Sequence, residues 1–422
     1  MSVGDLVLQL LGPDLPIRLE AWDGTALGPE DARAKIVLRS SDALRRIVTA
    51  PGELGFSRAF VAGDLDVEGD IFDALALRDR LPNVKLTPRQ VLEGVRLLGI
   101  GDLRPLAPPP EEIRLSGRRH SKERDAAAVA AHYDVGNEFY SLFLGSTMTY
   151  SCAVFESEDQ SLDDAQTNKY ELICRKLGLR PGMRLLDVGC GWGGMAMHAA
   201  RHFGVHAVGV TLSRAQQELA TTRVAEAGLS DVVEIRYQDY RDVADGPYDA
   251  ISSIGMFEHV GEARTAEYFA ALFALLRPEG RLLNHAITRP PYKKGRARLH
   301  PRGFIDRYVF PDGELLEVGM TVSAIQQAGF EVRHEESLRE HYALTLRHWV
   351  ANLESNWDEA VRVAGERRAR VWRLYMAGSA MLFEAGPTQI HQVLAVKLGD
   401  RGASGMPLRP DWDTSSLASP AR

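Results

Sequence analysis

The sequence has few cysteines, no long apolar run and no excess of positive charge. Three cysteines among 422 residues are too few for a disulfide framework and lack metal-ligand spacing, so we expect a protein of the reducing cytoplasm without a metal. A net charge of −7 argues against nucleic-acid binding, which usually needs a basic face. No apolar run approaches the roughly 20 residues that cross a bilayer, and the N-terminus lacks the features of a signal peptide. Any membrane contact is therefore expected to be peripheral, at the inner face of the membrane.

The length of the chain predicts two domains. Residues 1–100 mix short strands and helices without a catalytic constellation, which indicates a small α/β domain with a supporting or lipid-binding role. Residues 101–125 are rich in proline and charge and have no period, as in a linker. Residues 126–422 remain for one larger domain.

The larger domain has the pattern of an α/β fold. From about Gly182, five runs of the buried-strand type alternate with amphipathic segments: "RLLDVG", "HAVGVT", "VVEIRY", "YDAISSIG" and "GRLLNHAI". This alternation predicts a doubly wound, mostly parallel, Rossmann-like sheet with a helical cap and insertions. Ligands of such sheets bind outside the carboxyl ends of the strands.

A glycine-rich turn follows the first of these strands. In "LLDVGCGWGG", Gly189 and Gly191 let the backbone approach a ligand closely, and Asp187 precedes them. The third glycine comes two positions after the second, whereas the dinucleotide fingerprint spaces them by three. The turn resembles the cofactor loop of S-adenosylmethionine (SAM)-dependent methyltransferases; dinucleotide binding is the alternative.

Polar residues follow the next two strands. "GVTLSRAQ" has no acid for the ribose hydroxyls, so Thr211 and Gln216 are expected to bind them with neutral hydrogen bonds. "YQDYRD" offers Gln238 and Asp239 for the adenine edge. The alternative for each pair is a surface polar residue or a helix cap.

A carboxylate stands where a buried strand ends. Glu258 follows Met256 and Phe257 in "SSIGMFEHVG", and an ionised side chain that leaves water needs a partner or a function. Its place past a strand end predicts that it faces the ligand crevice.

Seven motifs occur in the order found in the cyclopropane-fatty-acyl-phospholipid synthase family, which residues 125–350 therefore resemble. They are "HYDVGNEFY", "MTYSCAVFE", "LLDVGCGWGG", "VGVTLSRAQ", "GMFEHVG", "FIDRYVFPDG" and "HYALTLRHW". The resemblance implies transfer of the SAM methyl group to a cis double bond of an acyl chain in a membrane phospholipid, through a carbocation.

The resemblance also implies two sets of site residues. The cofactor contacts that it implies are Tyr150, Ser151, Gly189, Gly191, Thr211, Gln216 and Asp239; Asp187, Leu212 and Gln238 are further candidates for cofactor binding from their places in the same motifs. A bicarbonate ion acting as general base would be held by Cys152, Glu258, His285, Ile287 and Tyr342.

These residue types suit the chemistry. Methylation of an alkene leaves a carbocation, and a small anion held by hydrogen bonds can remove the proton. His285 and Tyr342 can donate from their side chains, and Cys152 and Ile287 from their backbone N–H groups. Glu258 would position the base by accepting a hydrogen from it or by being protonated. Taken singly, a structural thiol, a core histidine and a packing tyrosine are the alternatives for Cys152, His285 and Tyr342.

A basic insertion at residues 288–320 follows the fifth strand. Against one acid, Asp306, its first part carries Arg289, Lys293, Lys294, Arg296, Arg298, Arg302 and Arg307. Each basic residue near an anionic membrane contributes about 1 kcal/mol, so the insertion is expected to engage lipid phosphates, with a solvated loop as the alternative.

The segment "FPDGELLEVG" departs from the "FPxGxLPS" typical of cyclopropane synthases at Glu314, Leu316 and Glu317. With the tail "GMPLRPDW", this resembles the actinobacterial branch that makes 10-methylene-stearoyl phospholipids, precursors of tuberculostearic acid. The alternatives are a cyclopropane synthase, a small-molecule or RNA methyltransferase, and a non-catalytic lipid carrier. A homodimer and a separate reductase for the methylene product are further candidate partners.

Overall fold

The computed structural model describes residues 2–50, 52–77, 104–117, 119, 121–133, 135–291 and 303–412. The chain forms two compact units, the first from residues 1–114, 299–311 and 357–381, the second from 115–298, 312–356 and 382–422. Within the described residues, each helix is too short or too polar to span a bilayer.

The first unit is a small α/β structure. Its sheet has the order β2-β1-β3-β4, in which β1 and β3 are parallel and the other pairs antiparallel. The strands are β1 (Arg18–Ala21), β2 (Ala26–Leu27), β3 (Ala34–Leu38) and β4 (Leu65–Gly69). The helices are α1 (Val3–Leu11), α2 (Ser41–Thr49), α3 (Glu53–Ala62), α4 (Ile71–Leu75), α12 (Phe304–Tyr308), α15 (Trp357–Ala364) and most of α16 (Glu366–Ala385).

The boundaries of this unit differ from those predicted, because α12, α15 and most of α16 come from the last third of the chain. Arg370 of α16 forms a two-pronged ion pair with Asp66 of β4, at 3.0 Å for both contacts. Arg373 donates to the carbonyl groups of Val67 and Gly69 at 2.8 and 3.0 Å. These two buried guanidinium groups bind a carboxylate and two carbonyl groups of β4 and so attach α16 to the N-terminal sheet.

The second unit contains a seven-stranded sheet with the order β10-β11-β9-β8-β5-β6-β7. The pairs from β9 to β7 are parallel, while β11 is antiparallel to both β9 and β10. The strands are β5 (Arg184–Val188), β6 (His206–Thr211), β7 (Val233–Tyr237), β8 (Tyr248–Ile254), β9 (Leu276–Thr288), β10 (Glu331–Ser337) and β11 (Gln389–Val396).

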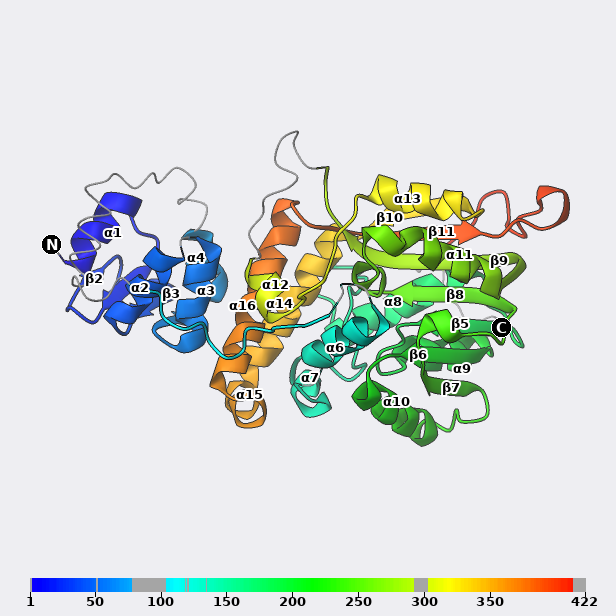
Figure 1. Ribbon diagram of the computed structural model, residues 1–422, viewed down its shortest axis with the longest axis horizontal. Coiled ribbons are helices and arrows are strands. Elements are labelled where there is room, and N and C mark those ends of the chain that lie inside the picture. Colours follow the sequence, from blue (N-terminus) through cyan, green and yellow to red (C-terminus); the bar gives the residue numbers. More distant parts are fainter. Residues whose placement is uncertain are drawn as a thin grey trace. The chain divides into compact units, whose positions relative to one another are not determined.

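Helices cover both faces of this sheet (Figure 1). Consecutive residues of β5 face opposite sides of the sheet and pack into different hydrophobic cores. Leu185 packs with α8 (Leu162–Leu177), α9 (Gly194–Phe203) and α10 (Arg214–Glu226). Its neighbour Leu186 packs with α11 (Thr265–Leu275) and α13 (Val318–Gln327). The predicted doubly wound, mostly parallel sheet and the small α/β region before it are confirmed.

The described part of this unit also contains the helices α6 (Lys122–Tyr133), α7 (Asn137–Leu144) and α14 (Arg339–Ser355). Asn352 of α14 donates to the carbonyl group of Phe143 at 3.1 Å, and the rings of Phe143 and Trp349 are 6.2 Å apart. These contacts fix α7 against α14, which carries the candidate site residue Tyr342.

Candidate active site

The glycine-rich loop connects β5 to α9. Gly189 and Gly191 have φ values of +77° and +54°, a region that side chains disfavour. A β-carbon on Gly189 would lie 3.1 Å from the side chain of Met256, whereas one on Gly191 would meet no atom of the described residues within 4 Å. The loop is therefore packed at Gly189 and open at Gly191, as a ligand-binding backbone requires.

Asp187, the penultimate residue of β5, is a buried carboxyl group just before this loop. The Ser252 hydroxyl donates to it at 2.7 Å. Burial raises the pKa of Asp187 to about 6, although the Ser252 hydrogen bond and the charge of Lys169 act in the opposite direction. Asp187 is thus held in place by the neighbouring strand β8.

Ser151 is held by two buried side chains of α8. The Lys169 ammonium donates to the Ser151 hydroxyl at 2.8 Å and to Gln166 Oε1 at 2.9 Å, and the Gln166 amide donates to the Ser151 carbonyl group at 2.9 Å. Burial lowers the pKa of Lys169 to about 7. Beside Ser151, the ring of Tyr150 stacks on Trp349 with centroids 5.2 Å apart. Sequence reasoning missed Lys169 and Gln166, because both fall in an ordinary amphipathic segment.

The residues expected at the ribose lie together, Thr211 at the end of β6 and Gln216 in the first turn of α10. The Thr211 hydroxyl donates to Gln216 Oε1 at 2.9 Å, and both side chains are buried. Ser213 caps α10, with half-buried Leu212 before it. Contact of these residues with a cofactor stays a prediction.

The residues expected at the adenine edge have local partners. Asp239 caps the short 3-10 helix η2 (Tyr240–Asp242) and accepts from the Arg241 side chain at 2.8 and 2.6 Å. The Gln238 amide donates to the carbonyl group of Asp242 at 2.8 Å. Both side chains act here in the capping and surface roles that were the alternatives, and their cofactor contacts stay predictions.

Glu258 lies in the 3-10 helix η3 (Phe257–His259), directly after β8. Its Oε1 accepts the backbone N–H of Ile287 at 2.6 Å, and within the described residues its Oε2 is buried without a hydrogen-bond partner. Burial raises the pKa of Glu258 to about 7, against the effect of the Ile287 N–H. The Ile287 N–H, expected to serve the bicarbonate ion, instead positions Glu258 in this structure.

His285 lies on β9, two residues before Ile287, and is fully buried. Its Nδ1 is 3.1 Å from the Gln392 amide nitrogen, and its Nε2 has no hydrogen-bond partner among the described residues. Burial, followed by the charges of Lys169 and Lys176, holds the pKa of His285 well below its ordinary range. The imidazole is therefore neutral and carries a single N–H.

Cys152 and Tyr342 are both buried. The Cys152 thiol donates to the Ala153 carbonyl group at 3.2 Å, and burial raises its pKa, so it is an unreactive thiol. The Ala153 N–H donates to the Thr345 hydroxyl at 3.0 Å, which joins this segment to α14. On α14, the ring of Tyr342 packs 4.6 Å from that of Phe383. The structure thus places Glu258 against Ile287 near His285, and Cys152 against the helix of Tyr342.

The segment that departs from the cyclopropane-synthase pattern borders Glu258. The backbone N–H of Glu314 donates to the Glu258 carbonyl group at 3.0 Å. Leu316 pairs with Thr288 at the end of β9 and is buried in the core.

The basic insertion is described only in part. Arg289 pairs with Glu317 at 3.2 Å and Arg307 with Glu112 at 3.4 Å, so these two cations have partners within the protein. The other five lie outside the described residues: Lys293, Lys294, Arg296, Arg298 and Arg302.

Comparison with known proteins agrees with this arrangement. The family described as mycolic acid cyclopropane synthetase matches residues 120–393. A "Probable fatty acid methyltransferase" of Mycobacterium tuberculosis is 48% identical over 94% of this chain and 95% of its own length. The tuberculostearic acid methyltransferase UfaA1 of the same organism is 34% identical over 94% of this chain and 92% of its own.

A solved structure shares the methyltransferase unit. The mycolic acid cyclopropane synthase CmaA1, in complex with SAH and CTAB, superimposes with a TM-score of 0.61 and 37% identity, over 64% of this chain and 98% of its own. Together with the sheet and its glycine loop, these matches show that the chain belongs to the mycolic acid cyclopropane synthetase family and is a methyltransferase with SAM as its methyl donor.

Proposed function

We propose that this enzyme methylates the cis double bond of an oleoyl chain in a membrane phospholipid and releases a 10-methylene-stearoyl chain. The observation that carries the proposal is a pair of buried polar atoms, Glu258 Oε2 and His285 Nε2, without partners in the described part of the chain. These two atoms lie near the carboxyl ends of β8 and β9, where ligands of such sheets bind, and this position points to a polar ligand. The name of the relative with 48% identity supports a fatty acyl substrate.

The glycine loop fits SAM, which supplies an electrophilic methyl group when bound. The open side of Gly191 gives the cofactor room beside the backbone. Lys169 fixes Ser151, and Thr211 orients Gln216, so both segments present ordered polar groups. Ordering these groups before binding lowers the entropic cost of holding the donor in line with the double bond.

Glu258 Oε2 and His285 Nε2 also fit bicarbonate as a ligand. When bound, this ion would supply a base for the proton that the reaction releases. Glu258, His285 and Tyr342 would hold it, with the backbone at Cys152 and Ile287. A protonated Glu258 and the single N–H of His285 can both donate to its oxygens, and a charged Glu258 can accept its O–H. The nearby charge of Lys169, which already affects the pKa of His285 and Cys152, would favour an anion here.

In the proposed reaction, the acyl chain gains one methyl group and loses one proton. Attack of the double bond on the methyl carbon forms a C–C bond, breaks the S–CH3 bond and leaves the positive charge on the neighbouring carbon. A hydride shift toward that carbon and loss of a methyl proton give the methylene chain. Loss of the methyl proton with ring closure gives the cyclopropane instead. In both, the protein must keep water from the cation, and the buried surroundings of Glu258 and His285 serve this purpose.

Two observations favour the methylene product. Leu316, where the sequence departs from the cyclopropane pattern, pairs with Thr288 at the end of β9, and the same segment contacts Glu258 through the backbone N–H of Glu314. In addition, one relative that matches nearly the whole chain is named a tuberculostearic acid methyltransferase. The cyclopropane synthase stays as the second candidate because the family carries that name and a cyclopropane synthase shares the fold.

The phospholipid substrate and a peripheral position on the membrane rest on the basic insertion. Since Arg289 and Arg307 have acidic partners, membrane attraction is assigned to Lys293, Lys294, Arg296, Arg298 and Arg302.

The test is product analysis with purified enzyme, SAM and vesicles of a dioleoyl phospholipid. Because the methylene and cyclopropane chains have equal mass, ozonolysis separates them: it cleaves the methylene to a ketone and spares the ring. Distearoyl vesicles are the control without a double bond, and an oleoyl thioester tests whether the lipid form matters. A ketone from dioleoyl vesicles alone supports the proposal, an ozone-resistant product identifies the cyclopropane synthase, and no acyl methylation rejects both.

A further inference from the structure

Three buried side chains form a line that ends at His285. The Lys176 ammonium of α8 donates to Gln392 Oε1 at 2.7 Å, and the Gln392 amide nitrogen lies 3.1 Å from His285 Nδ1. All three side chains are almost completely withdrawn from solvent. Gln392 lies on β11 directly opposite His285 on β9, so the strand register itself brings the amide to the imidazole.

Donor and acceptor chemistry gives this line a direction. An ammonium group can only donate, so the amide oxygen of Gln392 must face Lys176. The amide N–H then faces His285, and Nδ1 must accept it. A neutral imidazole has one N–H, and with Nδ1 accepting, that hydrogen is on Nε2. The opposite tautomer would set an N–H of His285 against an N–H of Gln392.

We propose that Lys176 and Gln392 are positioning residues that hold His285 as the Nε2–H tautomer, so that it donates to an acceptor oxygen of the ligand bound beside Glu258. The role of that hydrogen in turnover rests on the proposed function, whereas the tautomer itself does not. Nε2 has no hydrogen-bond partner in the described part of the chain, so it is the atom that this arrangement leaves for the ligand.

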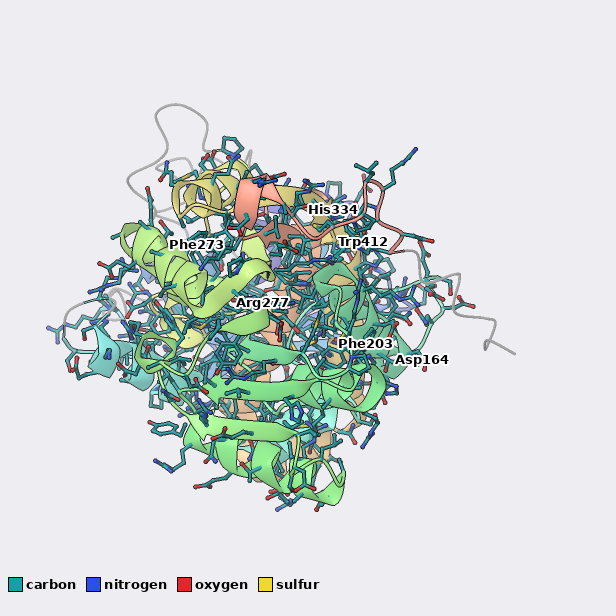
Figure 2. The ribbon with its side chains drawn as sticks, turned by 90° about the vertical axis from the view of Figure 1, so that its right-hand side faces the viewer. Asp164, Phe203, Phe273, Arg277, His334 and Trp412 are labelled. Carbon is teal, nitrogen blue, oxygen red and sulfur yellow. The ribbon has the colours of Figure 1, made fainter. Side chains whose placement is uncertain are left out.

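The far end of the line is fixed as well. Lys176 forms an ion pair with Glu336 of β10 and lies 5.9 Å from the ring centre of Trp412. Trp412 in turn packs edge-on against His334, with ring centres 4.4 Å apart, and the two lie next to each other in Figure 2. Because the Lys176 ammonium is held by Glu336 and Trp412, the Gln392 amide has one favourable orientation, with its oxygen toward Lys176.

Gln392→Glu tests the proposal with little change in size. A carboxylate keeps an acceptor toward Lys176 but offers a second acceptor to His285, which moves the imidazole hydrogen from Nε2 to Nδ1. Long-range 15N–1H spectra of histidine-labelled protein report the tautomer, and His285→Gln identifies the signal. We expect Nε2–H in the wild type and Nδ1–H in Gln392→Glu, with SAM affinity unchanged and turnover lowered about 10²-fold, as for loss of one positioned donor.

Two further variants keep the test decisive. Lys176→Met removes the anchor, frees the amide to rotate and should give a mixture of both tautomers even if Gln392→Glu does not fold. Lys397→Met is the control: this lysine donates to the Phe273 and Leu276 carbonyl groups near the start of β9, and its loss should change neither the His285 signal nor turnover.

The outcomes separate the two levels of the proposal. If the wild type carries the hydrogen on Nδ1, Lys176 and Gln392 do not hold His285 as the Nε2–H tautomer. The same conclusion follows if both Gln392→Glu and Lys176→Met keep the hydrogen on Nε2. A switched tautomer with full turnover overturns its role in the reaction. A wild type that does not methylate acyl chains refutes the proposed function, while the spectra still decide the tautomer.

Discussion

Replacing Glu258 with glutamine should change how the stability of the protein depends on pH. In the folded protein, burial raises the pKa of Glu258 from an ordinary 4.5 to about 7. Between these pH values the folded state keeps a proton that the unfolded state has lost, so the stability of the wild type falls as pH rises. Glutamine cannot ionise, and the variant lacks this loss.

The size of the effect follows from the two pKa values. The interval from 4.5 to about 7 corresponds to roughly 3 kcal/mol, most of it between about pH 5 and pH 8. Glu258→Gln should therefore gain roughly that amount relative to the wild type over this range. The raised pKa of Asp187 acts in the same direction, but it is present in both proteins and cancels in the difference.

Urea unfolding in carbon-dioxide-free buffer measures this difference, with circular dichroism and fluorescence as parallel probes. Glu218→Gln, on the exposed side of α10, is the matched control because it makes the same chemical change in water. A difference between wild type and Glu258→Gln that stays constant with pH would refute the assignment of Glu258 as a buried carboxyl with a raised pKa.

Three other predictions concern binding and turnover. Gly191→Val should abolish SAM binding, measured by calorimetry, because its methyl groups would enter space that the protein leaves open; unchanged affinity in a folded variant would reject the cofactor loop. Joint neutralisation of Lys293, Lys294, Arg296 and Arg298 should weaken sedimentation with anionic vesicles, most at low salt, and equal binding at low salt would make the insertion a solvated loop. Glu258→Gln loses an ionisable carboxyl group, and His285→Ala and Tyr342→Phe each lose a hydrogen-bond donor. Each variant should lower turnover by about 10²–10⁴-fold without loss of SAM binding. Fully additive effects on turnover would mean that the three side chains share no ligand.

The sheet of the second unit was predictable because its strands are short, buried and separated by amphipathic helices, so sequence periodicity alone indicates the layers. The boundary of the first unit was not. The contacts of Arg370 and Arg373 with β4 join residues about 300 positions apart, and no local pattern marks them.

The site was predictable where a residue stands at a strand end. Glu258 follows β8 and the glycine loop follows β5, as expected for a doubly wound sheet. Lys169, Lys176 and Gln392 were missed because each lies within a regular element, where its residue type reads as a surface or packing position. Their burial appears only once the helices and strands pack.

Labelled product analysis tests the central claim most directly. With SAM carrying a fully deuterated methyl group and dioleoyl vesicles, the account predicts acyl chains that keep two of the three deuterium atoms, because the proton lost comes from the transferred methyl group. Distearoyl vesicles should take up no label. Acyl chains with all three deuterium atoms would contradict loss of the proton from the transferred methyl group, and label in the head group or in distearoyl lipid would contradict methylation of the double bond.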